Sequence, residues 1–216
     1  MPELETAQAT GTIEVAAFDF DGTLTRGDTF LPYLQQGLGW PRFLLALVQS
    51  APWLGAYAVG LMSNHRAKAR LLKVSLGGRS LQETAQWSAD FVARYLPGQW
   101  QKQTMDRLPE HQRLGHRCVM VSASPGIYLH QVGQLLKLDA VICTELEVDE
   151  GTLTGRMLTA NCHGEEKVRR LKAWLAENVG QRPMVLHAYG DTQGDVPMLN
   201  LADCAWYRGQ PWPRKP

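Results

Sequence analysis

Short, mostly apolar runs alternate with amphipathic segments towards both ends of the chain. The runs cover residues 13–18, 118–121 and 185–189, and they stop at an acidic residue, a serine and a glycine respectively. Runs of this length predict buried strands, because a parallel strand is covered on both faces. Residues 165–178 mix apolar and charged side chains and predict a helix before the third run. Strands alternating with helices predict an α/β core built on a parallel sheet.

The middle of the chain breaks this alternation. From residue 28 to residue 105 every segment has the pattern of a helix, and Ser80-Leu81-Gln82-Glu83 is a capping box that starts one of them. We therefore predict an all-helical cap at residues 28–105. It is inserted into a core that residues 1–27 and 106–216 form together.

One stretch of the cap is unusually apolar. The 20 residues from Phe43 to Met62 carry no charge, and roughly 20 apolar residues are enough to span a bilayer. Polar residues and helix breakers interrupt the stretch, which favours two short helices hinged at Pro52 over a true span. A third alternative is peripheral contact with an anionic membrane surface through Trp40, Trp53 and Tyr57.

Composition narrows the class of protein. The 216 residues, of which 44% are hydrophobic, suffice for one α/β domain with a small insert. The formal net charge is +1, so no global field draws the chain to nucleic acid. Basic residues do gather on an amphipathic segment that ends at Gly77-Gly78, and we interpret them as a solvated face. They are Arg66, Lys68, Arg70 and Lys73.

Cysteine usage and the first residues favour a cytoplasmic location. The cysteines show no Cys-X-X-Cys spacing, which is typical of a reducing compartment. They are Cys118, Cys143, Cys162 and Cys204. The leader through Gly11 lacks the basic and apolar regions of a signal peptide. His163 and His187 are interpreted as hydrogen-bonding or packing residues, since no zinc-ligand spacing joins them.

Two acids mark the end of the first predicted strand. Asp19 and Asp21 stand two residues apart, and Gly22 follows them. An Asp-Gly pair is also a common turn, so this motif alone is weak. In open parallel sheets, however, ligands bind beyond the carboxyl ends of the strands. Two carboxylates at that edge can hold a metal ion and attack phosphorus.

Three further stretches strengthen this hypothesis. After the strand at 118–121, Ser124 is predicted as a helix N-cap with Pro125 as the first helical residue, so that backbone N–H groups and the Ser122 hydroxyl face an anion. Lys167 falls in the first turn of a helix, where a cation is electrostatically misplaced. Asp191 and Asp195 follow the third strand. Each stretch alone has an ordinary structural explanation.

Taken together and in this chain order, the four stretches resemble the haloacid dehalogenase superfamily of phosphohydrolases. The family pattern is Asp-X-Asp-Gly-Thr, a serine, a lysine and Gly-Asp-X3-Asp. The insertion after the first motif resembles the subgroup that includes phosphoserine phosphatase, although Gly194 stands where that subgroup commonly has asparagine. The apolar cap, with residues 28–32 and 161–167, resembles the phosphatidylglycerophosphatase C group. The resemblance implies a Rossmann-like core with parallel sheet, flanking helices and a cap.

The resemblance also implies a role for each motif residue. Asp19 is the nucleophile that forms an aspartyl-phosphate, and Asp21 is the general acid and base. The phosphate-binding residues are Thr23, Ser122, Ala123 and Lys167. The Mg²⁺ ligands are Asp19, the backbone carbonyl of Asp21, Asp191 and Asp195, the last acting through water or by orienting Lys167.

Two segments outside these motifs have patterns of their own. Residues 146–155 alternate about Asp149-Glu150-Gly151 and predict a hairpin, which we expect beside the active site. The proline-rich end at 210–216 shows no packing pattern.

Three functional classes remain open. The first is a Mg²⁺-dependent phosphomonoesterase, acting on a phospholipid head group such as phosphatidylglycerophosphate or on a small soluble metabolite such as phosphoserine. The second is a phospho-accepting signalling module, which the chain order of the acids and the large cap oppose. The third is a dehalogenase, which Asp21 opposes because such enzymes lack the second aspartate. The expected partner is therefore a phosphorylated small molecule or a lipid phosphate.

Overall fold

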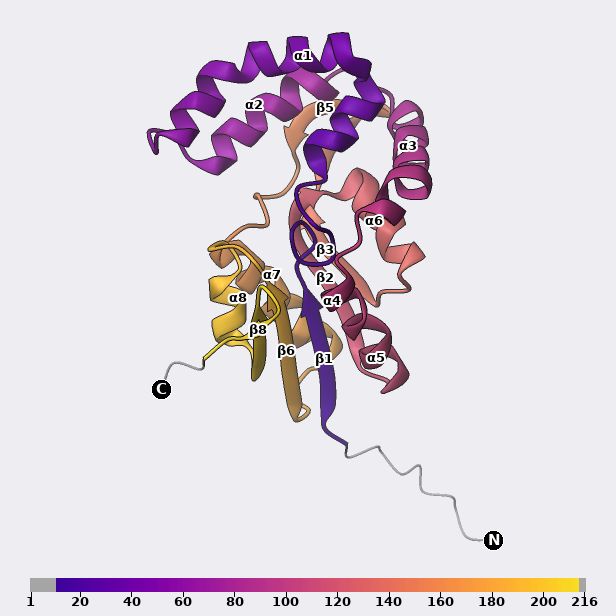
Figure 1. The fold of residues 1–216 in the computed structure, drawn as a ribbon, viewed down its shortest axis with the longest axis vertical. Coiled ribbons are helices and arrows are strands. Elements are labelled where there is room, and N and C mark those ends of the chain that lie inside the picture. The colour runs from indigo at the N-terminus through magenta and orange to yellow at the C-terminus, as the bar shows by residue number, and fades with distance from the viewer. Residues whose placement is uncertain (1–10, 214–216) are drawn as a thin grey trace, which may run out of the picture.

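A six-stranded sheet forms the centre of the protein, as shown by a computed structural model that describes residues 11–213 (Figure 1). The strand order is β3-β2-β1-β6-β7-β8, and every neighbouring pair is parallel except β7 with β8. The strands are β1 (Ile13–Phe18), β2 (Arg117–Pro125), β3 (Ala140–Thr144), β6 (Met184–Gly190), β7 (Cys204–Tyr207) and β8 (Gln210–Pro211). The predicted α/β class with a parallel sheet is confirmed. Most of the leader lies outside the described residues.

The register of β1 explains where the polar residues gather. Phe18, the last residue of β1, pairs with Met120 of β2 on one side and with Tyr189 of β6 on the other. All three strands run in the same direction, so the residues that follow them emerge at one edge of the sheet. We call it the carboxyl edge.

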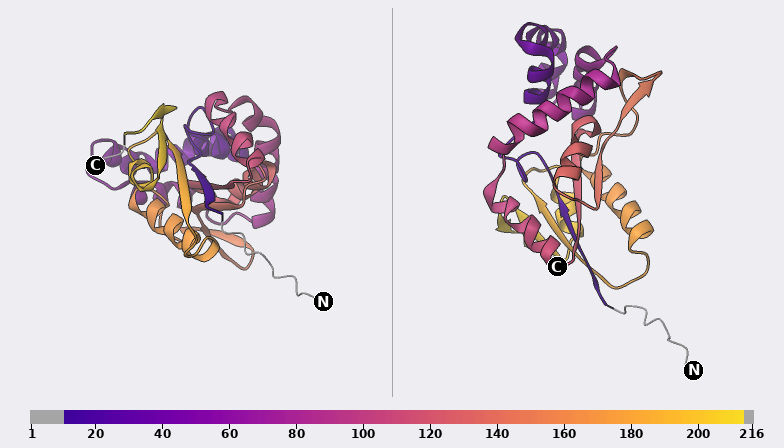
Figure 2. Two further views of the ribbon diagram at one scale, coloured as in Figure 1. Left: turned by 90° about the horizontal axis from the view of Figure 1, so that it is seen from below. Right: turned by 90° about the vertical axis from the view of Figure 1, so that its right-hand side faces the viewer.

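Helices cover both faces of this sheet (Figures 1 and 2). Each face has its own hydrophobic core. Val15 and Ala17 of β1 point into the core on one face, and Ala16 and Phe18 point into the core on the other, because side chains alternate along a strand. The first face carries α7 (Glu165–Asn178) and α8 (Val196–Leu201); the second carries α5 (Arg107–Arg113), preceded by α4 (Lys102–Met105), and α6 (Gly126–Leu135).

The cap helices lie above the carboxyl edge, at the end of the molecule opposite to the start of β1 (Figure 1). They are α1 (Phe30–Ala58), α2 (Asn64–Leu76), α3 (Leu81–Asp90), the π-helical turn η1 (Phe91–Tyr95) and the 3-10 turn η2 (Leu96–Gly98). The predicted capping box is confirmed, because the Ser80 hydroxyl accepts a hydrogen bond from the Glu83 N–H at 3.1 Å.

The predicted hinge at Pro52 is wrong. Helix α1 continues through Pro52 and breaks instead at Gly39, whose φ of 72° no other residue adopts cheaply. Pro41 then lies near the start of the second helical segment, where its missing N–H costs little. Pro52 lies on the exposed side of α1, where water can satisfy the carbonyl that it leaves unpaired.

The predicted hairpin forms over the expected residues, but it does not lie where it was expected in the fold. Strands β4 (Leu146–Asp149) and β5 (Thr152–Met157) pair antiparallel and join at Glu150 and Gly151, which both have positive φ. The hairpin packs on α2 of the cap rather than beside the carboxyl edge. A Cβ atom at Gly155 would lie 2.7 Å from the Cα of Lys73, so this glycine allows the two backbones to touch. The cap layer therefore also contains strands.

The expectation that the C-terminal end lacks packing is wrong for its described part. Gln210 and Pro211 form β8 on the edge of the sheet, and the Trp212 indole N–H donates to Asn200 Oδ1 at 2.9 Å. Trp212 therefore packs against the rest of the protein, although the prolines around it in the sequence gave no sign of this. Residues 214–216 lie outside the described part.

The apolar stretch of the cap faces outward over part of its length. Within residues 11–213, no helix is both long enough and apolar enough to cross a membrane. Two groups of exposed apolar side chains nevertheless occur, one in the middle of α1 and one at its end and in the turn after it. We call the group in the middle of α1 the outer stripe. The outer stripe consists of Trp40, Leu44, Leu45 and Val48, and Tyr57, Val59 and Leu61 follow.

Candidate active site

Asp19 lies at the carboxyl edge immediately after β1 and is 5% exposed. Its N–H donates to the Tyr189 carbonyl of β6 at 2.9 Å, which fixes the backbone where it leaves the sheet. Gly22 then turns the chain with a φ of 81°. A Cβ at Gly22 would lie 2.2 Å from a carboxylate oxygen of Asp191, so glycine is needed for the turn and for the approach of the second acid.

Lys167 joins two of the predicted acids. Its ammonium nitrogen lies 2.5 Å from Asp19 Oδ1 and 2.6 Å from Asp195 Oδ1, and all three side chains are buried. Burial alone would lower the pKa of Lys167, but the two carboxylates outweigh it and raise that pKa. The lysine therefore stays charged, and these contacts offset its unfavourable position in the first turn of α7.

Asp191 completes a carboxylate cluster with Asp19 and Asp195. One oxygen from each lies within 4.8 Å of the others. Burial raises the pKa of Asp19 and of Asp191, whereas Lys167 and hydrogen bonds from Thr192 outweigh burial at Asp195 and lower its pKa. Three carboxylates share one ammonium group here, so the cluster has a surplus of negative charge. These oxygen donors fit a hard divalent cation such as Mg²⁺.

The side chain of Asp21 points toward the cap. Its Oδ1 accepts hydrogen bonds from the Thr29 N–H at 2.7 Å and the Thr29 hydroxyl at 2.5 Å, and its Oδ2 accepts from the Ser124 hydroxyl at 2.5 Å. Burial, and then the charge of Asp28, raise the pKa of Asp21. The carboxyl group is thus held at the junction of cap and core in a setting that favours its protonated form.

The stretch after the second strand differs from its prediction. Ser124 is not a helix N-cap, because β2 continues to Pro125 and α6 begins at Gly126. The Ser124 hydroxyl reaches Asp21 instead, and its N–H donates to the Ser122 hydroxyl oxygen at 3.1 Å. Ser122 and Ala123 line the same cavity as Asp19 and Lys167.

Thr23 has a partner that its sequence motif does not reveal. Its hydroxyl donates to Asp191 Oδ1 at 2.9 Å, so in this structure it positions that carboxylate. The motif residues Asp19, Lys167, Asp191 and Asp195 are thus in one cluster, with Thr23 and Asp21 at its side.

Lys68 is a site residue that sequence reasoning missed. It was interpreted as part of a solvated basic face, yet its ammonium group donates to the Ala123 carbonyl and lies 3.4 Å from Asn161 Oδ1. Burial lowers the pKa of Lys68 to about 8, against the charges of Asp21 and Asp28. The only hint in the sequence was the apolar pair Leu71 and Leu72, which lie three and four residues after Lys68 and so on the same side of the helix.

His163 was also not assigned to the site. A Cβ at Gly194 would lie 2.3 Å from its Nε2, so the imidazole occupies the space of a side chain at position 194. Burial and the charge of Lys167 lower the pKa of His163, which favours the neutral ring. Cys162, next to it, is a packed thiol whose pKa burial raises to about 11.

A cavity of about 720 Å³ lies between cap and core. Its floor is polar and contains Asp19, Ser122 and Lys167. Its cap wall is mostly apolar. That wall includes Phe30, Leu31, Leu54, Tyr57, Ala67 and Leu71, with Lys68 among them. The arrangement can place an anionic group on the floor and an apolar group against the cap.

Comparison with known proteins identifies the family. The family model of the haloacid dehalogenase-like hydrolases matches residues 16–200. Protein CicA from Caulobacter vibrioides is 31% identical over 195 residues, which cover 90% of this chain and 85% of that protein. A phosphoserine phosphatase from Lactococcus lactis is 35% identical over 88 residues, which cover 41% of this chain and 40% of that protein. A crystal structure of a Bordetella pertussis protein of unknown function has a TM-score of 0.78 at 24% identity, covering 90% of this chain and 89% of that one. The chain is an enzyme of the haloacid dehalogenase-like hydrolase family, as its motifs predicted.

Proposed function

We propose that this protein is a Mg²⁺-dependent phosphatase that hydrolyses phosphomonoesters through an aspartyl-phosphate on Asp19. The observation that carries the proposal is the placement of Asp19 at the floor of the cavity, in contact with Lys167 and beside Asp191 and Asp195. An aspartate is ionised at neutral pH in water, and the nearby ammonium group favours that ionised form against the effect of burial.

The reaction proceeds in two displacements at phosphorus. An Asp19 carboxylate oxygen forms a bond to phosphorus while the ester P–O bond breaks, and Asp21 gives its proton to the departing alkoxide. Water then attacks the same phosphorus, Asp21 takes a proton from it, and inorganic phosphate leaves with the Asp19 carboxylate restored. The Lys167 ammonium group, the Ser122 hydroxyl and the backbone at Ala123 stabilise the charge on the phosphoryl oxygens.

Asp19, Asp191, Asp195 and the Asp21 carbonyl would hold the cation. When bound, Mg²⁺ offsets the surplus negative charge of the carboxylates and of the substrate phosphate. Thr23 and Thr192 hold Asp191 and Asp195 in place through hydrogen bonds of 2.9 Å and 2.7 Å.

The role of Asp21 predicts a shift in pH dependence. Asp28→Asn removes a negative charge that helps to raise the pKa of Asp21, while the amide oxygen can still accept the Leu31 N–H bond that caps α1. A general acid acts in its protonated form, so activity is lost as pH rises through its pKa. We expect the alkaline limb of the kcat/KM profile to move to lower pH in Asp28→Asn. Asp90→Asn, a change at a partly exposed carboxylate elsewhere in the cap, is the control, and an unmoved limb would contradict the role of Asp21.

The cap wall favours a substrate with an apolar part, and we propose a lipid phosphate such as phosphatidylglycerophosphate. Leu54 and Tyr57 of the uncharged stretch line the cavity, and the outer stripe of α1 adds apolar surface on the same helix. Exposed apolar surface of this kind is typical of contact with a membrane surface or a partner. Peripheral contact through the cap would bring the cavity to a substrate in the membrane.

A soluble phosphorylated metabolite is the second candidate. One relative is named a phosphoserine phosphatase, but it matches less than half of this chain. His163 fills the space beside Gly194, where that subgroup commonly carries an asparagine side chain. The amide of that asparagine therefore has no counterpart here.

Leu54→Glu distinguishes the two substrate classes. We expect kcat/KM on a lipid phosphomonoester in mixed vesicles to fall about 10- to 100-fold, because the variant loses an apolar contact of about 1.5–3 kcal/mol. Hydrolysis of p-nitrophenyl phosphate should change little. Gln49→Glu adds the same charge at an exposed position of α1 outside the cavity and is the matched control. Equal rates of the variant and wild type on vesicles would favour the soluble metabolite.

A further inference from the structure

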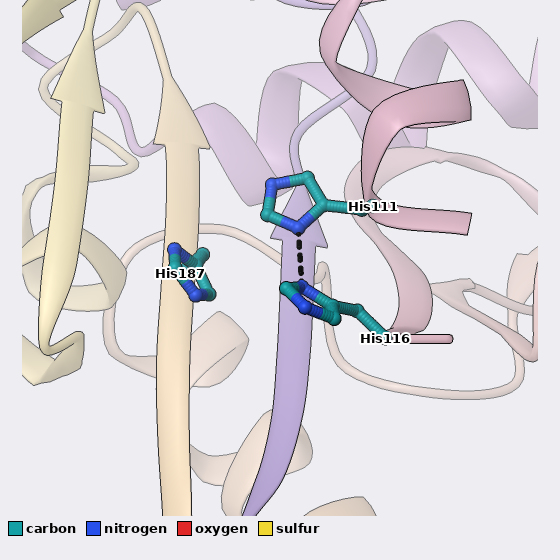
Figure 3. A group of neighbouring side chains, drawn as sticks. All are labelled: His111, His116 and His187. Carbon is teal, nitrogen blue, oxygen red and sulfur yellow. Dashed lines mark hydrogen bonds between the residues drawn. The ribbon is translucent and has the colours of Figure 1, made fainter. Parts of the chain in front are cut away.

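Three histidines meet on the face of the sheet that α5 covers (Figure 3), and none of them lines the catalytic cavity. His111 belongs to α5, His116 lies in the turn between α5 and β2, and His187 belongs to β6. Their ring centroids are 5.0 Å apart for His111 and His116, 4.9 Å for His111 and His187, and 5.7 Å for His116 and His187. Residues distant in the sequence thus form one cluster, which we call the histidine cluster.

The register of the sheet creates the space for these rings. His187 pairs with Ala16 of the central strand β1, and Ala16 belongs to the core on the α5 face. An alanine at this position leaves room above β1 that a larger side chain would fill. The rings of His111 and His116 approach His187 over β1, as Figure 3 shows.

The nitrogen atoms that face one another include one without a partner. His111 Nδ1 and His116 Nδ1 are 2.8 Å apart. His187 Nδ1 is buried and has no hydrogen-bond partner among residues 11–213. One nitrogen from each ring lies within 4.8 Å of the other two. A buried polar atom left unpaired is costly, and a bound cation would satisfy it.

Two of the rings have a hydrogen-bond partner at the Nε2 atom, as metal-binding histidines commonly have at the nitrogen that does not bind the metal. The Glu14 carboxylate lies 2.6 Å from His187 Nε2, and the Tyr189 hydroxyl lies 2.9 Å from His111 Nε2. A carboxylate accepts hydrogen bonds, so Glu14 holds the hydrogen of His187 on Nε2 and leaves the Nδ1 lone pair for a metal ion. The Tyr189 hydroxyl can do the same for His111 by accepting from its Nε2. The contact with Glu14 confirms the interpretation of His187 as a hydrogen-bonding residue.

Electrostatics favours the neutral form of the His111 ring. Burial, and then the neighbouring rings of His187 and His116, lower the pKa of His111 to about 4. Neutral imidazole is the form that binds metal ions, and the hydrogen that His111 Nδ1 and His116 Nδ1 share moves to an Nε2 atom when the ion binds.

We propose that His111, His116 and His187 bind one Zn²⁺ ion through their Nδ1 atoms. Three imidazole ligands suit zinc rather than Mg²⁺, and solvent beside the partly buried His116 completes the coordination. The bound ion ties α5 and the turn after it to β6. This site is separate from the carboxylate cluster and does not depend on the proposed function.

A second group with metal-ligating side chains is less suited. His130, Cys143 and Glu145 also lie within 4.8 Å of one another. There, however, Glu145 already pairs with His130 at 2.9 Å and accepts the Cys143 thiol hydrogen at 3.2 Å. Burial raises the pKa of Cys143 well above its ordinary value, which disfavours the thiolate that zinc needs.

The test measures zinc binding. The protein carries no affinity tag, and a chelator removes bound metal before dialysis. Zn²⁺ is titrated against a chromophoric chelator with excess Mg²⁺ present to occupy the carboxylate cluster. We expect one Zn²⁺ per chain with a Kd of about 1 µM or lower, and a thermal unfolding midpoint raised by about 5–10 °C at roughly 100 times the Kd.

Two histidine variants locate the ion. His116→Phe keeps an aromatic ring beside His187 but removes a ligand, so zinc affinity should fall at least about 100-fold and the zinc-dependent shift of the midpoint should disappear. His130→Phe should retain both. Co²⁺ in place of zinc should give the visible absorption of a low-coordinate site in wild type and lose it in His116→Phe. The proposal is overturned if wild type does not bind zinc, if His116→Phe binds it as tightly, or if His130→Phe is the variant that loses it.

Discussion

Asp19→Asn should abolish turnover while leaving the fold intact. Asparagine keeps the shape of the side chain but lacks the anionic oxygen that attacks phosphorus, and loss of a nucleophile costs at least roughly 10⁴-fold in kcat. Lys167 would keep its contact with Asp195, so the buried ammonium group is not left without a carboxylate. Phosphate release from p-nitrophenyl phosphate and the thermal unfolding midpoint measure the two effects.

Covalent labelling separates the nucleophile from the general acid. In Asp21→Asn, formation and hydrolysis of the intermediate both slow, and acid quenching after reaction with radioactive substrate should trap phosphate on the chain wherever hydrolysis slows more. The double variant Asp19→Asn/Asp21→Asn should trap none. Asp106→Asn removes an exposed carboxylate from the catalytic domain, outside the cap, and is the control for loss of a carboxylate. Activity of Asp19→Asn near that of wild type would refute the mechanism.

The sequence predicted the parts of the site that depend on the sheet. Three of the four motifs follow a short apolar run, and parallel strands end at one edge, so the convergence of Asp19, Ser122 and Asp191 follows from the strand pattern and the α/β class. Lys167 was noticed because a cation is unfavourable in the first turn of a helix, but its place in the site came from the resemblance to the family. In the structure it contacts Asp19 and Asp195.

Contacts between cap and core could not be predicted in this way. Lys68 lies in a run of basic residues whose ordinary explanation is solvation, and only the docking of α2 on the core places it beside the Ala123 carbonyl. The bond from Thr29 to Asp21 likewise depends on where α1 begins. The histidine cluster joins a helix, a turn and a strand, so no regular spacing announces it.

Local signals failed where two of them competed. Pro52 was a plausible hinge, but Gly39 can adopt the positive φ that a sharp change of direction requires. Ser124 followed by Pro125 has the pattern of a helix start, yet β2 extends through both residues and pairs Pro125 with Thr144. The pairing with β3, which the local sequence does not show, thus decided the conformation at Ser124 and Pro125.

Removal of Mg²⁺ should abolish activity, and Mg²⁺ alone should restore it. Asp19, Asp191 and Asp195 converge with one ammonium group among them, so the substrate phosphate adds negative charge to a cluster that already has a surplus. Without a divalent cation, the approach of phosphate to Asp19 is electrostatically unfavourable. Ca²⁺ should inhibit, because its larger coordination shell places the Asp19 carboxylate differently.

The Asp191→Asn variant tests this assignment against general effects of chelation. It keeps an oxygen that can accept the Thr23 hydroxyl bond but removes one negative charge, so half-maximal activity should need at least about tenfold more Mg²⁺. His116→Phe, which alters only the histidine cluster, should show the Mg²⁺ dependence of wild type. A chelator strips both sites, and recovery with Mg²⁺ alone therefore assigns the activity to the carboxylates. If activity persists after exhaustive chelation, or if Asp191→Asn responds to Mg²⁺ as wild type does, the carboxylate cluster is not the metal site of the reaction.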